Sequence, residues 1–227
     1  LKFTSAMTGN TISTQSGALI LGGTGSGEIT QTLPALPSGG LTKNGTGTWT
    51  LGGANTYTGV TTISTGKLFI NGNQSSATGN VTVAANATLG GTGTINGPVT
   101  NAAGGTVSPG TSVGKLTVGN AVTMQAASVC WMEVDNDNST NDMLTASSGI
   151  AFGGTLVVTN IGTADFTNGQ VIQLFGTGNS GAFSSIVIPG VAAYDATTSG
   201  VMSASDVGNG TTSITGQTGD LLSTGAP

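Results

Sequence analysis

The chain has 227 residues, of which 40 are glycine, six are proline and 6% are charged. Because 36% of the residues are hydrophobic and proline is rare, the glycines indicate turns in a packed fold and exclude a disordered linker. The net charge of −5, with only four cations, excludes a basic surface, so we expect neither nucleic acid binding nor membrane insertion.

A short motif returns along the chain: an apolar run, then glycines, then threonine. It occurs at 21–25, 89–93 and 152–156, and apolar pairs recur roughly every 20 residues. One turn of such a repeat cannot bury its own inner face, so each turn must stack on its neighbours. The pattern predicts an all-β fold, a single-stranded parallel β-helix (β-solenoid) of about 10 rungs without significant helix.

Short strands bounded by glycine, asparagine or serine follow one another in chain order. Apolar clusters between residues 1 and 29 predict the first group of rungs. The next strands are expected at 48–51, 60–63, 67–70, 81–83, 88–89, 94–95, 116–118 and 122–124. Each is short and rich in β-branched residues, and no segment has a helical period.

The texture of the sequence predicts three regions. Residues 1–121 are expected to form solenoid rungs, with a repeat core at 40–118. From 122 to 190 the strands lengthen and aromatic residues such as Trp131 reappear, which predicts a thicker C-terminal part or cap. Residues 191–227 are small and polar, and we expect a last irregular coil or an extended tail there.

One cluster of charge stands out in this weakly charged chain. Glu133, Asp135, Asp137 and Asp142, with asparagines between them, form a run of oxygen donors of the kind that calcium prefers. The run lacks the glycine and the flanking helices of a helix-loop-helix calcium site. A solvated acidic turn between two strands explains the same residues, so we expect no metal and no cofactor.

Glu133 and Asp135 are also a candidate carboxylate pair for cleaving glycosides, since alternate residues of a strand share a face. The chain has no histidine and no arginine to bind a substrate or tune a pKa. Cys130 is the single cysteine, and its apolar neighbours predict a buried structural side chain. We therefore expect no catalytic residues and no enzyme, with a polysaccharide-cleaving β-helix as a remote alternative.

Three large aromatic residues are candidates for stacking against sugar rings: Trp49, Tyr57 and Trp131. Aromatic side chains in glycine-rich strands are more often core residues, because they bury a large apolar area. We therefore expect all three to lie in the core.

Several stretches of the chain resemble the autotransporter-associated β-strand repeat and the segments that follow it. The repeat itself is matched by GLTKNGTGTWTL at 40–51, GANTYTGVTTI at 53–63 and GKL at 66–68. The following segments are matched at 89–95, 105–110, 115–118, 142–144 and 152–158. Together the resemblance covers roughly residues 40–190.

The resemblance implies a right-handed parallel β-helix, secreted or displayed at the surface of a Gram-negative-type bacterium. The family is mostly adhesive or structural, and its repeats carry no catalytic residues. The strand pattern of a membrane barrel is absent from the sequence, so we expect the shorter secreted relatives to be the better comparison.

These observations predict a non-enzymatic extracellular structural protein, a rigid β-solenoid. Because few charges guard the strand edges at its two ends, we expect copies to associate head to tail into a surface filament or fibre. The alternative is an adhesin, a carbohydrate- or surface-binding passenger module whose partner is a surface polysaccharide.

Overall fold

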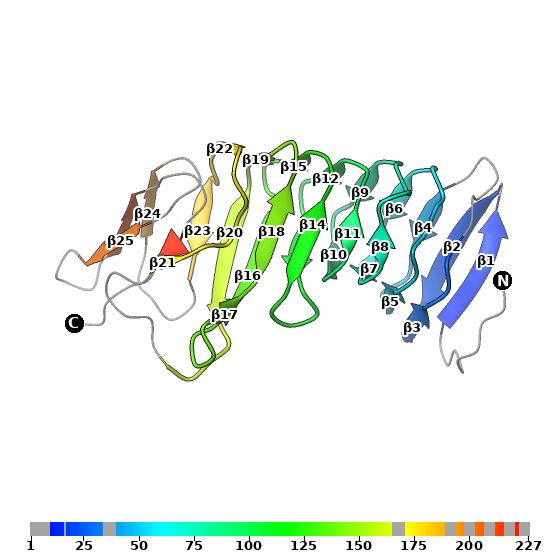
Figure 1. Ribbon diagram of the computed structural model, residues 1–227, viewed down its shortest axis with the longest axis horizontal. Coiled ribbons are helices and arrows are strands. Elements are labelled where there is room, and N and C mark those ends of the chain that lie inside the picture. Colours follow the sequence, from blue (N-terminus) through cyan, green and yellow to red (C-terminus); the bar gives the residue numbers. More distant parts are fainter. Residues whose placement is uncertain are drawn as a thin grey trace.

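The structure is a computed structural model that describes residues 10–15, 17–33, 40–164 and 171–188, with four short strands closer to the C-terminus. The described residues form an all-β parallel solenoid of about six turns and contain no helix (Figure 1). The all-β parallel fold is therefore confirmed. The number of turns is lower than the expected 10 or so, because the later turns are longer than the repeat length that we assumed.

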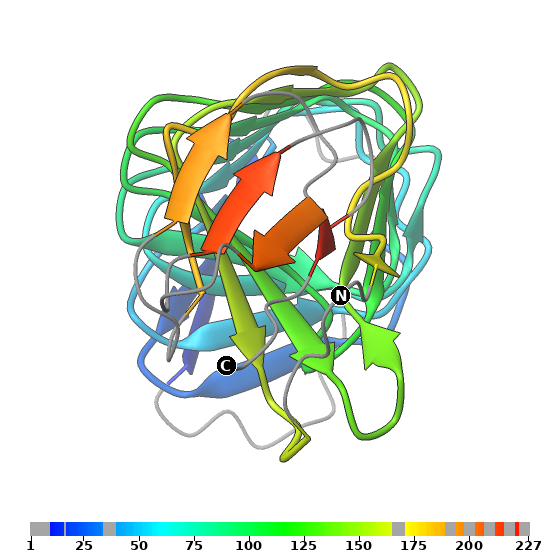
Figure 2. The same ribbon diagram turned by 90° about the vertical axis from the view of Figure 1, so that its left-hand side faces the viewer.

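Strands of successive turns stack into three sheets, which form the sides of the solenoid (Figure 2). The first sheet contains β1 (Asn10–Gln15), β2 (Ala18–Gly23), β4 (Leu41–Lys43), β6 (Thr61–Ile63), β9 (Val81–Val83), β12 (Val99–Asn101), β15 (Val122–Met124), β19 (Ile150–Phe152) and β22 (Ser180–Gly181).

The second sheet contains β3 (Ser26–Ile29), β5 (Thr48–Leu51), β7 (Gly66–Ile70), β10 (Ala87–Gly91), β13 (Thr106–Pro109), β16 (Val129–Asp135), β20 (Thr155–Asn160) and β23 (Ser185–Val187). The third sheet contains β8 (Asn73–Gln74), β11 (Thr94–Ile95), β14 (Lys115–Val118) and β18 (Met143–Ala146). The strands within these sheets pair in parallel, except that β1 pairs antiparallel with β2 and the short β17 (Thr140–Asn141) antiparallel with β16.

The turns lengthen toward the C-terminal end. On the first sheet Leu41 pairs with Thr61, 20 residues further on, whereas Val122 pairs with Ile150, 28 residues further on. The extra residues lie where the chain passes from the second sheet to the third, at 110–114 and in the β16–β17 hairpin. These insertions project from the body of the solenoid in Figure 1.

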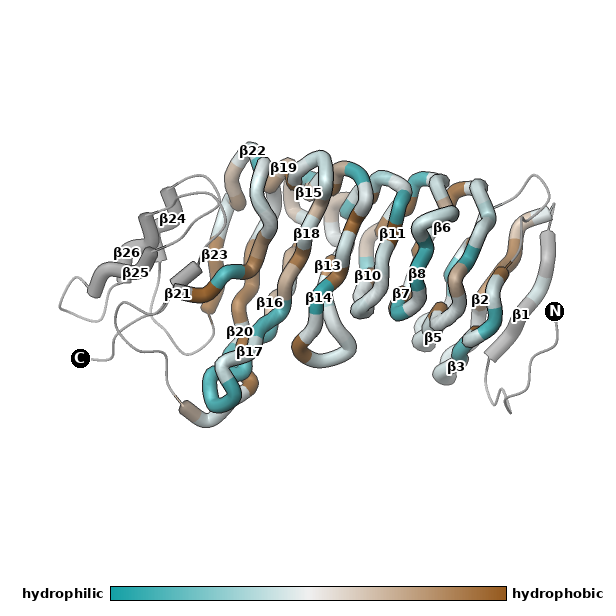
Figure 3. The backbone as a smooth tube through the Cα atoms, in the orientation of Figure 1, coloured by the Kyte–Doolittle hydropathy of each residue, from teal (hydrophilic) through white to brown (hydrophobic). Residues whose placement is uncertain are grey.

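Alternation along each strand separates the core from the surface. The inward side chains are apolar and almost fully buried, as in Leu41, Leu68 and Leu89, and Figure 3 shows hydrophobic residues recurring along the strands. The outward side chain at the middle of each short strand of the first sheet is threonine in five successive turns, at positions 42, 62, 82, 100 and 123. Threonine suits this position because its β-branched side chain favours a strand and its hydroxyl stays in water.

Every turn changes direction at the corner between the first and second sheets through one residue with positive φ. These residues are Gly23, Gly45, Gly66, Asn86, Gly104, Ala127, Gly154 and Gly181. At Gly66 a Cβ atom would run into carbonyl oxygens of the preceding turn, so both the backbone angle and the space require glycine. The prediction that glycines mark the corners of stacked turns is confirmed there.

The two ends of the solenoid differ. At the N-terminal end β1 folds back onto β2. Near the C-terminal end the rings of Phe152, Phe175 and Phe183 pack together, with centroids 4.7 to 5.8 Å apart. Beyond them β24 (Tyr194–Thr197), β26 (Thr212–Thr215) and β25 (Ser203–Asp206) form a separate small sheet, which lies across that end in Figure 2. Nearby, β21 (Val171–Ile172) pairs with β27 (Leu221–Leu222). The predicted boundaries at residues 121 and 190 stay predictions.

Candidate functional site

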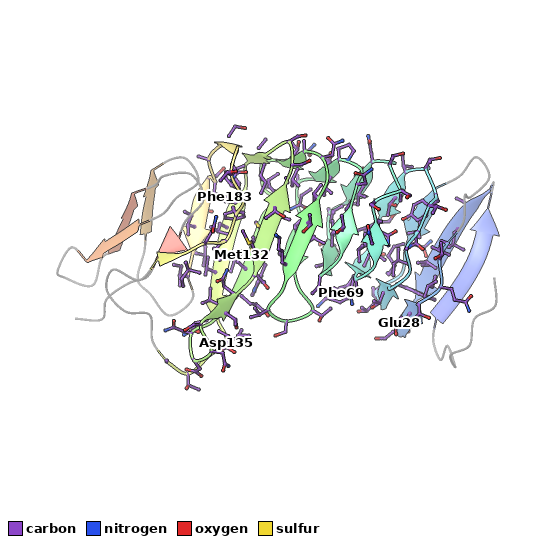
Figure 4. The ribbon with its side chains drawn as sticks, in the orientation of Figure 1. Glu28, Phe69, Met132, Asp135 and Phe183 are labelled. Atoms are coloured by element: carbon purple, nitrogen blue, oxygen red, sulfur yellow. The ribbon has the colours of Figure 1, made fainter. Side chains whose placement is uncertain are left out.

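The strand β16 presents the second tryptophan and two of the acidic residues on its outer face. Cys130, Met132 and Val134 point inward and are buried. The outward side chains between and after them are Trp131, Glu133 and Asp135. In Figure 4, Met132 lies within the body of the solenoid and Asp135 lies where β16 runs into the projecting hairpin.

Trp131 heads a row of outward apolar side chains on the second sheet. It is 40% exposed and pairs with Val157, which in turn pairs with Val187, and Val187 is 45% exposed. We call Trp131, Val157 and Val187 the apolar row. Because parallel strands lie about 4.8 Å apart, the row extends about 10 Å along the solenoid axis.

The core prediction for the aromatic residues is confirmed for two of the three. Trp49 and Tyr57 are buried; the indole Nε1 of Trp49 donates to the carbonyl of Gly22 at 3.0 Å, and the Tyr57 hydroxyl lies 2.8 Å from that of Thr61. The prediction is wrong for Trp131, which lies on the outer face. The signal was present in the sequence, since a strand that buries the apolar residues on both sides of Trp131 must turn the indole outward.

Asp142 is fully buried where the projecting hairpin returns to the third sheet. Its two carboxylate oxygens accept hydrogen bonds at 2.8 Å from the backbone N–H of Gly114 and from that of Glu133. Burial raises its pKa to about 7, and the negative charge of Glu133 adds to the rise, while the two N–H donors hold it down in part. Asp142 therefore clamps two projecting segments onto the solenoid and does not face solvent.

The other two aspartates stabilise the projecting loops. Asp137 is exposed and accepts hydrogen bonds from the backbone N–H groups of Thr163 and Ala164, which lowers its pKa. Asp135 accepts hydrogen bonds from the backbone and the side chain of Asn138. Together these bonds tie the β16–β17 hairpin to the loop after β20 and close the hairpin itself.

The four residues weighed for calcium therefore do not converge. Among the described residues, no three acidic or cysteine side chains are placed to hold a metal ion. Asp142 points into the interior, Asp137 is bound by the loop after β20, and Glu133 lies on the outer face. Their arrangement matches an acidic turn that organises its own backbone.

Glu133 and Asp135 share the outer face of β16, as expected for a carboxylate pair. The Asp135 carboxylate is taken up by Asn138, so the two acids differ in role. Cys130 is buried, and burial together with the nearby charge of Asp142 raises the pKa of its thiol, which makes it an unreactive core residue as predicted.

A family model, described as the passenger-associated-transport-repeat, matches residues 41–68. The chain carries the autotransporter-associated repeat. The match covers β4, β5, β6 and the start of β7, so the repeat spans one turn of the solenoid and the beginning of the next. The resemblance stated from the sequence is confirmed.

Two curated relatives share parts of this chain. The adhesin BmaC autotransporter of Brucella suis biovar 1 (strain 1330) is 52% identical over 73 residues, which are 32% of this chain and 2% of that protein. An extracellular serine protease of Serratia marcescens is 38% identical over 120 residues, which are 53% of this chain and 11% of that protein. The chain thus spans a small part of either relative.

Within the repeat, the side chain of Lys43 points into the core between turns. It is buried, and its Nζ donates to the carbonyls of Asn44, Gly45 and Thr65 at 2.9 to 3.1 Å. Burial lowers its pKa. The amine satisfies three carbonyl groups of two successive corners, so it is a structural cross-link of the repeat.

Proposed function

We propose that the chain is a non-enzymatic, extracellular segment that serves as a rigid rod in a protein secreted from, or displayed on, a Gram-negative bacterium. The observation that carries the proposal is the unbroken stack of parallel strands on two sheets, from β2 to β22 and from β3 to β23. Each turn adds backbone hydrogen bonds and a layer of buried apolar side chains, so stiffness is spread along the whole length.

Two further observations support the extracellular and non-enzymatic parts of the proposal. The repeat also occurs in a protein named as an autotransporter adhesin, and a second relative is named as extracellular. That second relative is a serine protease, but these 227 residues contain no histidine and cannot supply a Ser-His-Asp triad. A membrane-spanning helix is not found in the part of the chain that the structure describes.

The proposal includes the right-handed coiling implied by the resemblance. Parallel strands of one sheet are joined by right-handed crossovers in about 98% of cases, which favours that hand.

We also propose that copies associate head to tail. The outer edge of β1 is unpaired in the first sheet as described, and an unpaired edge is a template for another strand. We expect the weight-average mass of the full chain in sedimentation velocity to rise with concentration. Ser13→Lys, at an exposed position of β1, should suppress that rise.

The matched control is Thr123→Lys, which adds the same charge at an exposed position in the middle of the first sheet. It should leave self-association unchanged. A wild-type chain that stays monomeric at every concentration would refute head-to-tail assembly, and equal effects of the two lysines would refute the role of β1.

A second candidate function is surface binding by the side of the rod. The observation that favours it is the exposure of Trp131 on a sheet whose other tryptophan is buried. Retention of the purified chain on bacterial or host cell surfaces, compared with Trp131→Ala, tests this function without assuming a ligand.

A further inference from the structure

The apolar row is unusual because its side chains have not been placed in the core although the same strands bury every inward residue. In β16 and β20 the inward residues Met132 and Val158 are fully buried, whereas Trp131 and Val187 are among the most exposed large hydrophobic residues described. The exposure of an indole costs free energy in water unless a partner covers it. The row is therefore a candidate contact surface.

The hydrogen-bonding groups beside the row are available to a ligand. In the described part of the chain, the indole Nε1 of Trp131 donates to no acceptor, in contrast to that of Trp49, which is bonded to Gly22. The carboxylate of Glu133, the next outward residue on β16, accepts no hydrogen bond from any described residue. One donor and one strong acceptor thus lie on the same strand as the exposed ring.

Polar residues border the apolar row on both sides. On one side the hydroxyls of Thr155 and Ser185 lie 2.8 Å apart, on the outer face of β20 and β23. On the other side Glu133 is paired with Thr159. Because outward residues of one strand are about 6.8 Å apart, the surface is a narrow apolar strip with hydroxyl and carboxylate groups along both margins.

We propose that this surface, formed by the apolar row and its two polar borders, binds a neutral glycan, with the C–H face of a sugar ring stacked on Trp131 and its hydroxyls bonded to Glu133. The inference rests on the second candidate function above and names the ligand class for it. Sugar rings combine an apolar face with hydroxyl groups at the rim, which is the complement of an apolar strip with polar margins.

The charges around the strip favour a neutral ligand. Glu133, Asp135 and Asp137 lie on or beside it, and the lysine of the second sheet, Lys67, lies three strands away on β7. Like charges repel, so uronic acid polymers, phosphate groups and nucleic acids are disfavoured there.

The size of the strip also argues against a folded protein partner. A stable protein interface buries about 800 Å² on each partner and involves about 20 or more residues on each side. Three apolar side chains spread over about 10 Å fall well short of such an interface. They suffice for one or two sugar rings.

The test uses the full chain and the neutral oligosaccharides cellohexaose, chitohexaose and mannohexaose, with polygalacturonate as the acidic counterpart. The chain has two tryptophans, of which Trp49 is buried, so fluorescence changes on titration report on Trp131. We expect at least one neutral glycan to shift the emission of Trp131 to shorter wavelength and to protect it from iodide quenching. Polygalacturonate should do neither.

Variants assign the binding to this surface. Trp131→Ala should weaken the affinity measured by calorimetry about tenfold or more, and Trp131→Tyr should restore much of it. Glu133→Gln should weaken it less. Val60→Ala is the matched control, because Val60 is 55% exposed but lies at the start of the first sheet's β6.

The outcomes separate the two proposals. If no neutral glycan binds, or if Trp131→Ala and Val60→Ala bind glycan as the wild type does, the inference is wrong. Retention on cell surfaces that depends on Trp131 without any glycan affinity would keep the second candidate function and overturn the glycan. Binding of polygalacturonate through Trp131 would overturn the neutral ligand class.

Discussion

The two tryptophans of this chain occupy opposite environments in the same sheet. Trp49, in the repeat, is fully buried and its indole is hydrogen-bonded across turns, while Trp131, four strands further along, is 40% exposed. The repeat has short turns and fills its core with large side chains and a buried lysine. The C-terminal turns add insertions and put apolar side chains outside, which separates the part that holds the rod together from the part that meets other molecules.

The largest effect should come from removing the buried indole. Trp49→Ala leaves a cavity and an unpaired carbonyl, so we expect a loss of about 3–5 kcal/mol in the free energy of unfolding. Trp131→Ala should change it by less than about 1 kcal/mol, since half-exposed side chains contribute little. Urea unfolding followed by circular dichroism measures both, and similar losses would erase the contrast between the two regions.

Acidity should act on the C-terminal insertions through Asp142. Its pKa is about 7 in the fold and 3.8 otherwise, so the folded chain holds this proton more tightly. Stability should therefore be highest at low pH, fall as the pH rises from about 4 to about 7, and level off above, by a few kcal/mol at most because one pKa unit is worth about 1.4 kcal/mol.

Urea midpoints measured across this range test the effect, with Asp142→Asn as the variant that removes the titration. The pH dependence should flatten in that variant. Stability that instead rises over the same interval would mean that the two N–H donors outweigh burial.

The lysine of the repeat should matter more than a lysine on its surface. Lys43→Met removes a donor from three buried carbonyls, and we expect a loss of about 1–3 kcal/mol. The control Lys67→Met changes the same charge at an exposed site and should stay within about 0.5 kcal/mol. Equal midpoints for the two variants in urea would show that the cross-link adds nothing.

The smallest effect concerns the corner shared by both regions. Ala127 has a φ of 61° and is exposed, so Ala127→Gly should raise the melting temperature slightly, by relief of up to about 1 kcal/mol. The corresponding change in the repeat, Gly66→Ala, should lower it, because the new Cβ meets carbonyl oxygens of Gly45 and Gly47. Calorimetric melting of both variants should show opposite signs.

Much of the architecture could be predicted from the sequence. The glycines, the short β-branched strands and the 20-residue spacing indicated stacked parallel turns, because a turn of that length must rely on its neighbours for burial. The number of turns was overestimated, since the spacing of the repeat does not hold where segments such as 110–114 are inserted.

The surface was harder to predict than the core. Alternation along β16 is a local property, and it places Trp131 opposite Met132 without further information. That Val157 and Val187 continue the row depends on register between strands 26 and 30 residues apart, which composition and spacing do not specify. The same holds for Asp142, whose partners come from two different turns.

The sequence by itself determined that this chain is a stack of short strands turned at glycines, because backbone conformation and side-chain alternation are local properties. Only the tertiary structure decided that Asp142 closes a loop in the interior, that Lys43 joins two corners, and that a row of apolar side chains stays outside. These three outcomes depend on which residues of different turns come to lie side by side, and the register of the stack is what brings them together.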